Sequence, residues 1–484
     1  MLNPMIDRYL AFAVVAVVMT TGCRTAHGTR MPDAETIVDG ATPLGVRIDT
    51  TDAPFGVSID RAPWRSRDGS TDVRGFWTDI AVLDIVAAER DALDLNQRTF
   101  AIALQHLMAS DPQGAAIAFH ALHKTASDSL VRTYARVGLT MALTWYSDWA
   151  TIARLEQDPD SVSASSTDPR VRQSAVERWA HAFGDAPPPA ITFSKEPIIL
   201  PLHRSSIGTP VVSVLVNGRP HDFWVDTGAS MTVLSTGIAI EAGVRLAAND
   251  TLSLGVIGGS IEARAVLIDS LSLGGFMARG ITAAVVNAST LRLGYRMENG
   301  HANPIPIDGV IGSDLLRRMD LVIDASAGTM SIRKPRRGVR GVRNLFWVGY
   351  PVVRLITREG RPLLFGLDTG AEGTYVTMEF LRKLPRTQVA ARRGQLGGLG
   401  GKKERTEWVV RELAVSDGKY AIELRNAPIG PDRPWNFVTF DGVIGSDIAL
   451  GTRLHLDFEN GVFDTRPSSA LTVGSTTTPM PEPD

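Results

Sequence analysis

The sequence contains a single cysteine in 484 residues, which excludes an intrachain disulfide. It also lacks an excess of either charge, because 50 basic and 52 acidic residues leave a net charge of −2. Nothing in this balance favours a nucleic acid partner. No group of His and Cys has metal-ligand spacing, and we expect neither a metal nor another cofactor. The composition, 44% hydrophobic and 21% charged, fits a globular chain of about two or three domains.

Residues 1–23 have the pattern of an export signal. Arg8 precedes an apolar run at 9–19 that is too short to span a bilayer as a stable helix. Cys23 follows Thr-Thr-Gly, which resembles a bacterial lipoprotein processing box. We therefore predict lipidation of Cys23, a location in the bacterial periplasm or outer membrane, and a tether over 24–72. A strand at 45–48 within this tether, and a pro-segment that covers the cleft, are alternatives that the sequence leaves open. Ordinary signal cleavage, with Cys23 discarded or free, is the alternative; loss of membrane association in Cys23→Ser would favour lipidation.

Residues 73–185 are predicted to form an all-α helical domain. Apolar residues recur at spacings of three and four, and Asp111-Pro112 is typical of a helix start. The succession of helices resembles a tetratricopeptide-type array, which implies a protein partner for this domain. A helical bundle without a binding role is the alternative. A stiff segment, Asp185-Ala-Pro-Pro-Pro189, separates this domain from strand-like sequence.

The rest of the chain contains the same sequence pattern twice. An apolar strand leads into Asp226-Thr227-Gly228-Ala229, and another leads into Asp368-Thr369-Gly370-Ala371. Such a triplet should occur by chance roughly a tenth of a time in a chain of this length. A Gly-rich segment begins 29 positions after each Asp (226 to 255, and 368 to 397), and Asp-Gly-Val-Ile-Gly-Ser-Asp follows at 308–314 and 441–447. We infer an internal duplication, with units at 196–335 and 342–467 and a disordered tail at 468–484.

Two carboxylates held face to face cannot both ionise easily, so they share a proton. One can then act as a base and the other as an acid on a water between them, without a metal. A single Asp-Thr-Gly is more often a plain turn capped by its Asp, but the repetition favours chemistry. Turn and capping roles are also favoured over a metal site for the acidic residues of the later motif, Asp308, Asp314, Asp441 and Asp447.

This set of motifs resembles the retropepsin-like aspartic proteases: apolar-apolar-Asp-Thr-Gly-Ala, a Gly-Gly flap, and a later apolar-apolar-Gly, in this order twice. The resemblance implies a multidomain fold in which the helical domain precedes mainly-β tandem retropepsin-like lobes. It implies Asp226 and Asp368 as the catalytic pair, with Thr227 and Thr369 bonded across the two-fold axis and Gly228 and Gly370 leaving room for close approach. Retropepsins commonly dimerise, whereas this chain carries both halves.

The Gly-rich segments are predicted to be flap hairpins that close over an extended peptide. Their residues are Gly255, Val256, Ile257, Gly258, Gly259, and Gly397, Gly398, Leu399, Gly400, Gly401. Surface hairpins without a function are the alternative for these segments. The sequence thus predicts a hydrolase, an aspartic endopeptidase acting on a peptide or protein substrate. The rival hypothesis is a non-catalytic peptide-binding or scaffold lipoprotein that uses the cleft and the helical domain.

Overall fold

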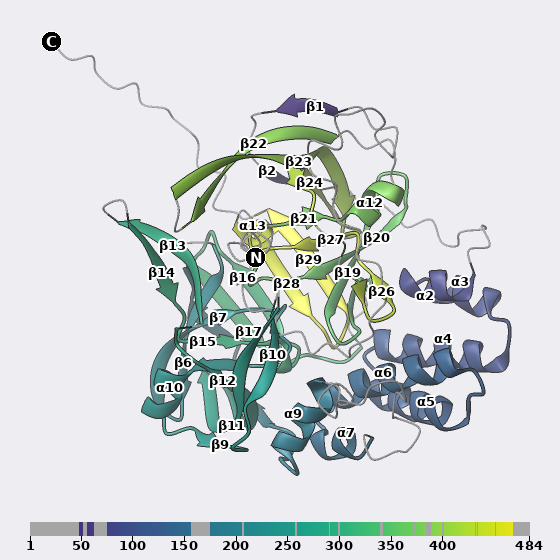
Figure 1. The fold of residues 1–484 in the computed structure, drawn as a ribbon, viewed down its shortest axis with the longest axis horizontal. Coiled ribbons are helices and arrows are strands. Elements are labelled where there is room, and N and C mark those ends of the chain that lie inside the picture. Colours follow the sequence, from purple (N-terminus) through teal and green to yellow (C-terminus); the bar gives the residue numbers. More distant parts are fainter. Residues whose placement is uncertain are drawn as a thin grey trace, which may run out of the picture.

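The structure is a computed structural model that describes fifteen stretches of the chain. These are 48–51, 56–61, 75–155, 175–205, 208–256, 259–289, 291–298, 301–338, 342–371, 373–383, 389–398, 401–430, 432, 434–450 and 452–467. The chain has a helical N-terminal region and a mainly-β C-terminal region (Figure 1). The predicted signal with Cys23, the tail at 468–484 and the flap positions Ile257, Gly258, Leu399 and Gly400 lie outside the described residues.

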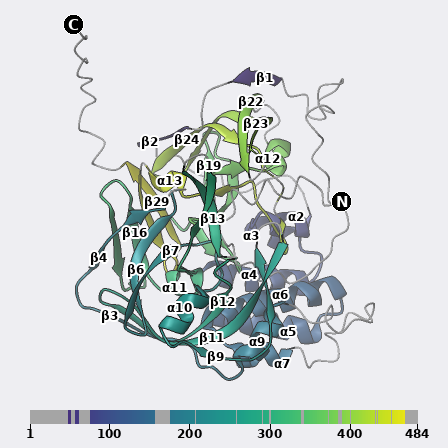
Figure 2. The same cartoon turned by 60° about the vertical axis from the view of Figure 1, so that its left-hand side comes forward.

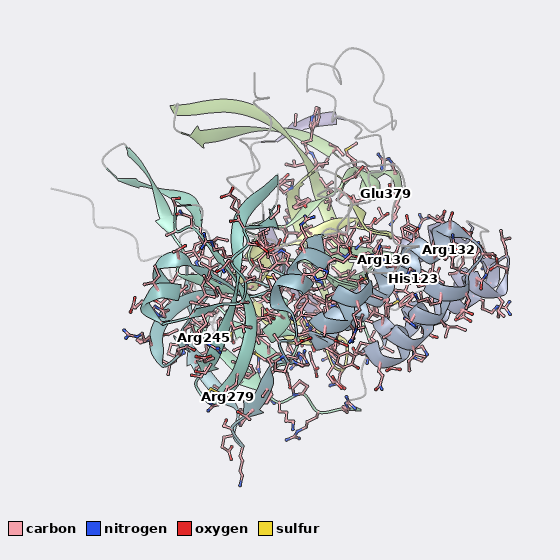
Figure 3. The ribbon with its side chains drawn as sticks, turned by 60° about the horizontal axis from the view of Figure 1, so that its bottom comes forward. His123, Arg132, Arg136, Arg245, Arg279 and Glu379 are labelled. Carbon is pink, nitrogen blue, oxygen red and sulfur yellow. The ribbon has the colours of Figure 1, made fainter. Side chains whose placement is uncertain are left out.

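The helical region ends at Phe183, close to the predicted break. Its helices are α2 (Phe76–Ala81), α3 (Ile85–Asp91), α4 (Leu95–Met108), α5 (Pro112–Thr125), α6 (Ser129–Tyr146), α7 (Trp149–Leu155) and α9 (Ala175–Phe183). Asp111 caps α5 as predicted, because its side chain accepts the amide of Gly114 at 3.0 Å and Pro112 is the first helical residue. Arg136 on α6, labelled in Figure 3, forms an ion pair with Glu177 on α9. No helix in the described stretches is both long and apolar enough to cross a membrane.

The first β half is built on a ten-stranded sheet. Its strands are β3 (Ala190–Phe193), β5 (His203–Arg204), β6 (Pro210–Val216), β7 (Arg219–Val225), β8 (Val233–Ser235), β9 (Arg245–Leu246), β10 (Leu252–Val256), β11 (Gly259–Leu273), β12 (Phe276–Val286) and β15 (Gly309–Ile311). Helices α10 (Thr236–Glu241) and α11 (Ser313–Leu316) and the hairpin of β13 (Arg292–Glu298) and β14 (His301–Pro306) complete it. The turn between β6 and β7 uses Asn217 and Gly218, both at positive φ, as the Asn-Gly pair predicts.

The second β half contains another ten-stranded sheet. Its strands are β1 (Ile48–Thr51), β2 (Gly56–Arg61), β18 (Leu345–Trp347), β19 (Pro351–Thr357), β20 (Pro362–Leu367), β21 (Tyr375–Val376), β22 (Val389–Gly398), β23 (Gly401–Ser416), β24 (Tyr420–Pro428) and β27 (Gly442–Ile444). Helices α12 (Met378–Lys383) and α13 (Asp447–Leu450) and the small hairpin of β25 (Pro434–Trp435) and β26 (Val438–Thr439) complete it.

Part of the segment expected to be a tether is β-structure. β1 pairs in parallel with β22, and β2 pairs antiparallel with β24. In β2, Val57 and Ile59 pack against the hydrophobic core, and they alternate with Ser58 and Asp60. This period of two over six residues is a strand pattern that the Asp- and Pro-rich surroundings conceal. The described strands of the segment therefore extend the second sheet at two separate places.

The two β halves share a five-stranded sheet. Its order is β29 (Val462–Pro467), β28 (Thr452–Asp457), β16 (Asp320–Asp324), β17 (Thr329–Arg333) and β4 (Ile198–Pro201). β16 from the first half pairs with β28 from the second, with Leu321 opposite Leu456. Three of its strands, β29, β16 and β4, are labelled close together at the left of Figure 2. Continuous hydrogen bonding across the sheet ties the halves together within one chain.

The helical region is docked on both β halves. Arg317 after α11 donates to the carbonyls of Thr144 at 2.7 Å and Trp145 at 3.1 Å, at the C-terminal end of α6. Phe437, between β25 and β26, makes edge-to-face contact with Phe100 at 5.5 Å and with Tyr134 at 5.6 Å. These contacts are buried aromatic packing and capped carbonyls, so the helical region is an integral part of the described structure.

Candidate active site

Matching strands deliver the two Asp-Thr-Gly triplets. β7 ends at Val225 and β20 ends at Leu367, one residue before each aspartate. β15 runs parallel to β7, and β27 runs parallel to β20. The amide of Asp226 donates to Ile311 O at 3.1 Å, and the amide of Asp368 donates to Ile444 O at 2.9 Å. The same local frame therefore fixes the backbone of both aspartates.

The side chains of Asp226 and Asp368 come together at the contact between the halves. Each carboxylate lies against the glycine of the opposite triplet: a Cβ added at Gly228 would be 2.5 Å from Cγ of Asp368, and one added at Gly370 would be 2.3 Å from Cγ of Asp226. Any side chain at Gly228 or Gly370 would therefore displace a carboxylate. Both aspartates are fully buried. The sequence-predicted Asp and Gly residues form one cluster.

The two threonines link the triplets reciprocally. Thr227 N–H donates to Thr369 Oγ1 at 3.0 Å, and Thr369 N–H donates to Thr227 Oγ1 at 3.0 Å. The hydroxyls in turn donate across the contact, Thr227 Oγ1 to Leu367 O at 2.9 Å and Thr369 Oγ1 to Val225 O at 2.7 Å. All four bonds are buried, where an unpaired group would be costly. They hold the two aspartates at a fixed separation.

The hydrogen bonds to the two carboxylates differ. Asp226 Oδ1 accepts the amides of Gly228 at 2.8 Å and Ala229 at 3.0 Å, and the Asp226 carboxyl is also hydrogen-bonded to the facing carboxyl of Asp368. Asp368 Oδ1 accepts the amide of Ala371 at 3.0 Å, and Asp368 Oδ2 accepts the Tyr350 hydroxyl at 3.3 Å. Burial, followed by repulsion from Asp368, raises the pKa of Asp226 well above its ordinary value. The arrangement favours one proton on the pair.

Tyr350 is a site residue that the sequence did not reveal. It stands before Pro351, outside the triplet and outside the Gly-rich segments. No general pattern marks a tyrosine at this place as a partner for a carboxylate 18 positions later (350 to 368). The available signal was the repeated Pro-Val-Val at 210–212 and 351–353, which aligns the residues in front of it.

The acidic residues of the later motif lie behind the triplets. Asp314 Oδ1 accepts the Thr232 hydroxyl at 3.1 Å, and Asp447 Oδ1 accepts the Thr374 hydroxyl at 2.6 Å. Desolvation raises the pKa of each of these two carboxyls to about 6. The other two acidic residues accept backbone amides, Asp308 from Asp222 and Asp441 from Leu364. Within the described stretches, no group of three or more His, Cys, Asp or Glu is placed to hold a metal.

The Gly-rich segments lie on hairpins. β10 and β11 pair down to Val256 opposite Gly259, and β22 and β23 pair down to Gly398 opposite Gly401. The β22–β23 hairpin stands out at the upper edge of Figure 1, next to β1. The helical region contacts the first hairpin, where Trp179 Nε1 donates to Ser253 O on β10 at 3.2 Å. The closing of these hairpins over a peptide stays a prediction.

A cavity of about 50 Å³ lies between the helical region and the residues next to the triplets. Its walls include Thr140, Met141, Trp149, Ser230, Met231 and Gly349. Ser230 and Met231 directly follow the first triplet, and Gly349 precedes Tyr350. No sequence pattern indicates that α6 and α7 reach this place, because the contact joins regions far apart in the chain.

Comparison with known proteins supports the aspartyl protease family. The family model described as aspartyl protease matches residues 212–315, the part that holds Asp226. Among solved structures, a retropepsin-like aspartic protease from Rickettsia conorii is similar at 20% identity, with a TM-score of 0.18. That likeness covers 30% of this chain and 91% of the other, and its low TM-score carries no argument. No curated protein matches the chain.

Proposed function

We propose that this protein is a single-chain aspartic endopeptidase, built from tandem retropepsin-like lobes with Asp226 and Asp368 as its catalytic pair. One observation carries the proposal: each carboxylate lies against the glycine of the opposite triplet, while the threonines bond across the contact. This geometry brings two acids together in a buried place, which is what proton sharing requires. The family match over 212–315 supports the same class.

In the proposed reaction, the Asp368 carboxylate takes a proton from water as the water oxygen bonds to the peptide carbonyl carbon. Asp226 gives its proton to the carbonyl oxygen, and a neutral gem-diol forms. A gem-diol hydroxyl then returns a proton to Asp226, Asp368 protonates the amide nitrogen, and the C–N bond breaks. The products are an acid and an amine, and the pair again holds one proton. The raised pKa of Asp226 supports its role as the initial acid.

The proposed catalytic unit needs no second chain. The threonine bonds and the β16–β28 pairing join the two halves within one polypeptide. Specific activity should therefore stay constant on dilution. Mixing Asp226→Asn with Asp368→Asn protein should restore nothing, unless halves exchange between chains.

The decisive experiment incubates the purified protein with a peptide library at several pH values. Wild type should cleave with a bell-shaped profile and an acidic optimum, because activity needs one proton on the pair. Asp226→Asn and Asp368→Asn should each lose at least about 1,000-fold in kcat/KM, with unchanged thermal unfolding midpoints as the control for folding. Near-native turnover in either variant would disprove the assignment of the pair.

A non-catalytic peptide-binding lipoprotein is the second candidate. The complete burial of both carboxylates favours it, since substrate has to reach them for catalysis. Peptide binding without cleavage by the wild-type protein would establish this alternative. Lipidation at Cys23, export and a protein partner for the helical region remain proposals under either function.

A further inference from the structure

The two β halves place different residues at the same position in front of their aspartates. Pro210-Val211-Val212 on β6 and Pro351-Val352-Val353 on β19 align by sequence. They align by pairing too, because Val211 lies opposite Trp224 and Val352 lies opposite Gly366, each two residues before its aspartate. The residue before the proline is Thr209 in the first half and Tyr350 in the second. Continuing each register places Thr209 opposite Asp226 and Tyr350 opposite Asp368.

These matched hydroxyls make different hydrogen bonds. Thr209 Oγ1 donates to Gly370 O, a backbone carbonyl of the other half, at 3.3 Å. Tyr350 Oη donates to Asp368 Oδ2, a carboxylate oxygen of its own half, at 3.3 Å. The duplication is thus broken at one place next to the two carboxyls: Asp368 accepts the Tyr350 hydroxyl of its own half, whereas the matched Thr209 hydroxyl bonds a backbone carbonyl instead of Asp226.

The surroundings of Tyr350 fix its ring. The residue is 2% exposed, and its ring centroid lies 5.2 Å from that of Trp435 and 5.8 Å from that of Phe440. Trp435 is itself held by a bond from Nε1 to Val348 O at 2.9 Å. Gly366 leaves room for the ring, since a Cβ there would be 3.0 Å from Tyr350 Cε1. In the first half the large and small side chains occupy the opposite positions. Trp224 stands where the second half has Gly366, and Thr209 stands where it has Tyr350.

We propose that Tyr350 is a positioning residue that keeps the negative charge of the pair on Asp368 and leaves the shared proton on Asp226. A hydroxyl donates more strongly to a carboxylate than to a carboxylic acid, so its bond stabilises the ionised form of Asp368. The charged group that faces Asp368 across the contact is Asp226. The carboxyls behind the triplets, Asp314 and Asp447, bond to Thr232 and Thr374 instead. This inference rests on the proposed function for its consequence in catalysis.

The test follows the two carboxyl carbons by NMR titration of protein labelled with 13C at aspartate carboxyls, with Asp226→Asn and Asp368→Asn supplying the assignments. In Tyr350→Phe, the titration midpoint of Asp368 should move upward by about one pH unit, because one charge-assisted bond is lost. Thr209→Val is the matched control: it removes a hydroxyl at the corresponding position and should leave this midpoint in place. An unmoved midpoint in Tyr350→Phe would overturn the proposal.

Activity supplies a second readout. If the wild type cleaves peptides, Tyr350→Phe should lower kcat about 10-fold and move only the acid limb of kcat/KM upward. A purely structural role would lower kcat without moving that limb, and a rise in activity would show that Tyr350 blocks the site; either result overturns the proposal. 3-Fluorotyrosine at 350, a stronger donor that retains the ring, should move the Asp368 midpoint downward. Failure of the wild type to cleave any peptide would defeat the proposed function alone, since the titration needs no substrate.

Discussion

The two β halves share a frame and differ in what they attach to it. In both, a hairpin strand ends on Asp-Thr-Gly, a three-residue strand runs parallel behind it, and a threonine six positions after the Asp (226 to 232, and 368 to 374) bonds an acidic residue. The first half then carries Arg317 and Arg318, which donate to carbonyls at the end of α6. The second half carries Tyr350 against its aspartate. Both halves therefore keep the strands and threonines that hold the aspartates. They differ in the residues that contact the helical region and in the hydrogen bonds to the aspartate.

The largest effect on stability should come from removing the threonine hydrogen bonds, to which both halves contribute equally. Thr227→Val and Thr369→Val each remove a buried hydroxyl that accepts one amide and donates to one carbonyl of the other half. Each change leaves both partners unpaired, so we expect about 4 kcal/mol of destabilisation in urea unfolding. The Ser variants keep the hydroxyl and should lose less than about 1 kcal/mol. Equal losses for Val and Ser at either position would show that the cross-half bonds contribute little.

Much of this shared frame was predictable because it is local and repeated. Three features each depend on a few neighbouring residues that favour few local structures. These are the Asp-Thr-Gly triplets, the Asn217-Gly218 turn and the Asp111 cap. A second copy at equal spacing removes most chance explanations. Proximity of the two aspartates was also predictable, because it needed only the resemblance and the repeat.

The differences between the halves were not predictable, because they depend on contacts between distant segments. The contact of Tyr350 with Asp368 depends on the pairing of β19 with β20, which aligns the two residues. β2 joins β24 across 359 to 369 positions (61 to 420, and 56 to 425), and Ser58 also bonds Glu423 at 3.3 Å. The charge of Arg317 gave no sign that it would be buried between Trp145 and Trp347. Sequence periodicity predicts helices and strands, but it does not predict which of them pack or pair with one another.

A second, smaller effect should appear in the pH dependence of stability. Asp314 and Asp447 have pKa values of about 6 in the folded protein because of desolvation, against 3.8 ordinarily. A raised folded pKa gives stability that is fully present below about pH 4 and is lost as the pH rises through about 6. Both residues are half-buried, so we expect about 2 kcal/mol per site rather than the full conversion of about 3 kcal/mol. Urea unfolding measured from pH 4 to pH 7.5 should show this loss.

The corresponding Asn variants sharpen the comparison between halves. Asp314→Asn and Asp447→Asn should each flatten the pH dependence. Asp447 accepts three bonds: the Thr374 hydroxyl and the Ile448 amide at Oδ1, and the Thr374 amide at Oδ2. An asparagine side chain has an acceptor oxygen at only one of these two atoms. At pH 7.5, Asp314→Asn should therefore be the more stable of the two. A wild-type protein that gains stability between pH 4 and pH 7 would contradict the assignment.

The smallest effect should come from making the first half resemble the second at the helical contact. Leu450 occupies the position that corresponds to Arg317, so the change is Arg317→Leu. It removes the donors to Ser313 O and Thr144 O, which is unfavourable, and it also removes a buried charge whose pKa falls to about 9 through desolvation, which is favourable. The terms oppose each other, and Arg318 still donates to Trp145 O at 2.6 Å. We expect a net loss of about 1 kcal/mol.

Arg245→Leu supplies the control for this last change. Arg245, labelled in Figure 3, is 67% exposed and pairs with Asp269 on the surface of the same half, so its loss should be within about 0.5 kcal/mol of wild type. Limited proteolysis between α6 and β3 should accelerate in Arg317→Leu and stay unchanged in Arg245→Leu, because Arg317, unlike Arg245, bonds carbonyls at the end of α6. Equal proteolysis in both variants would mean that the aromatic contacts of Phe437, rather than the arginine bonds, keep the helical region in place.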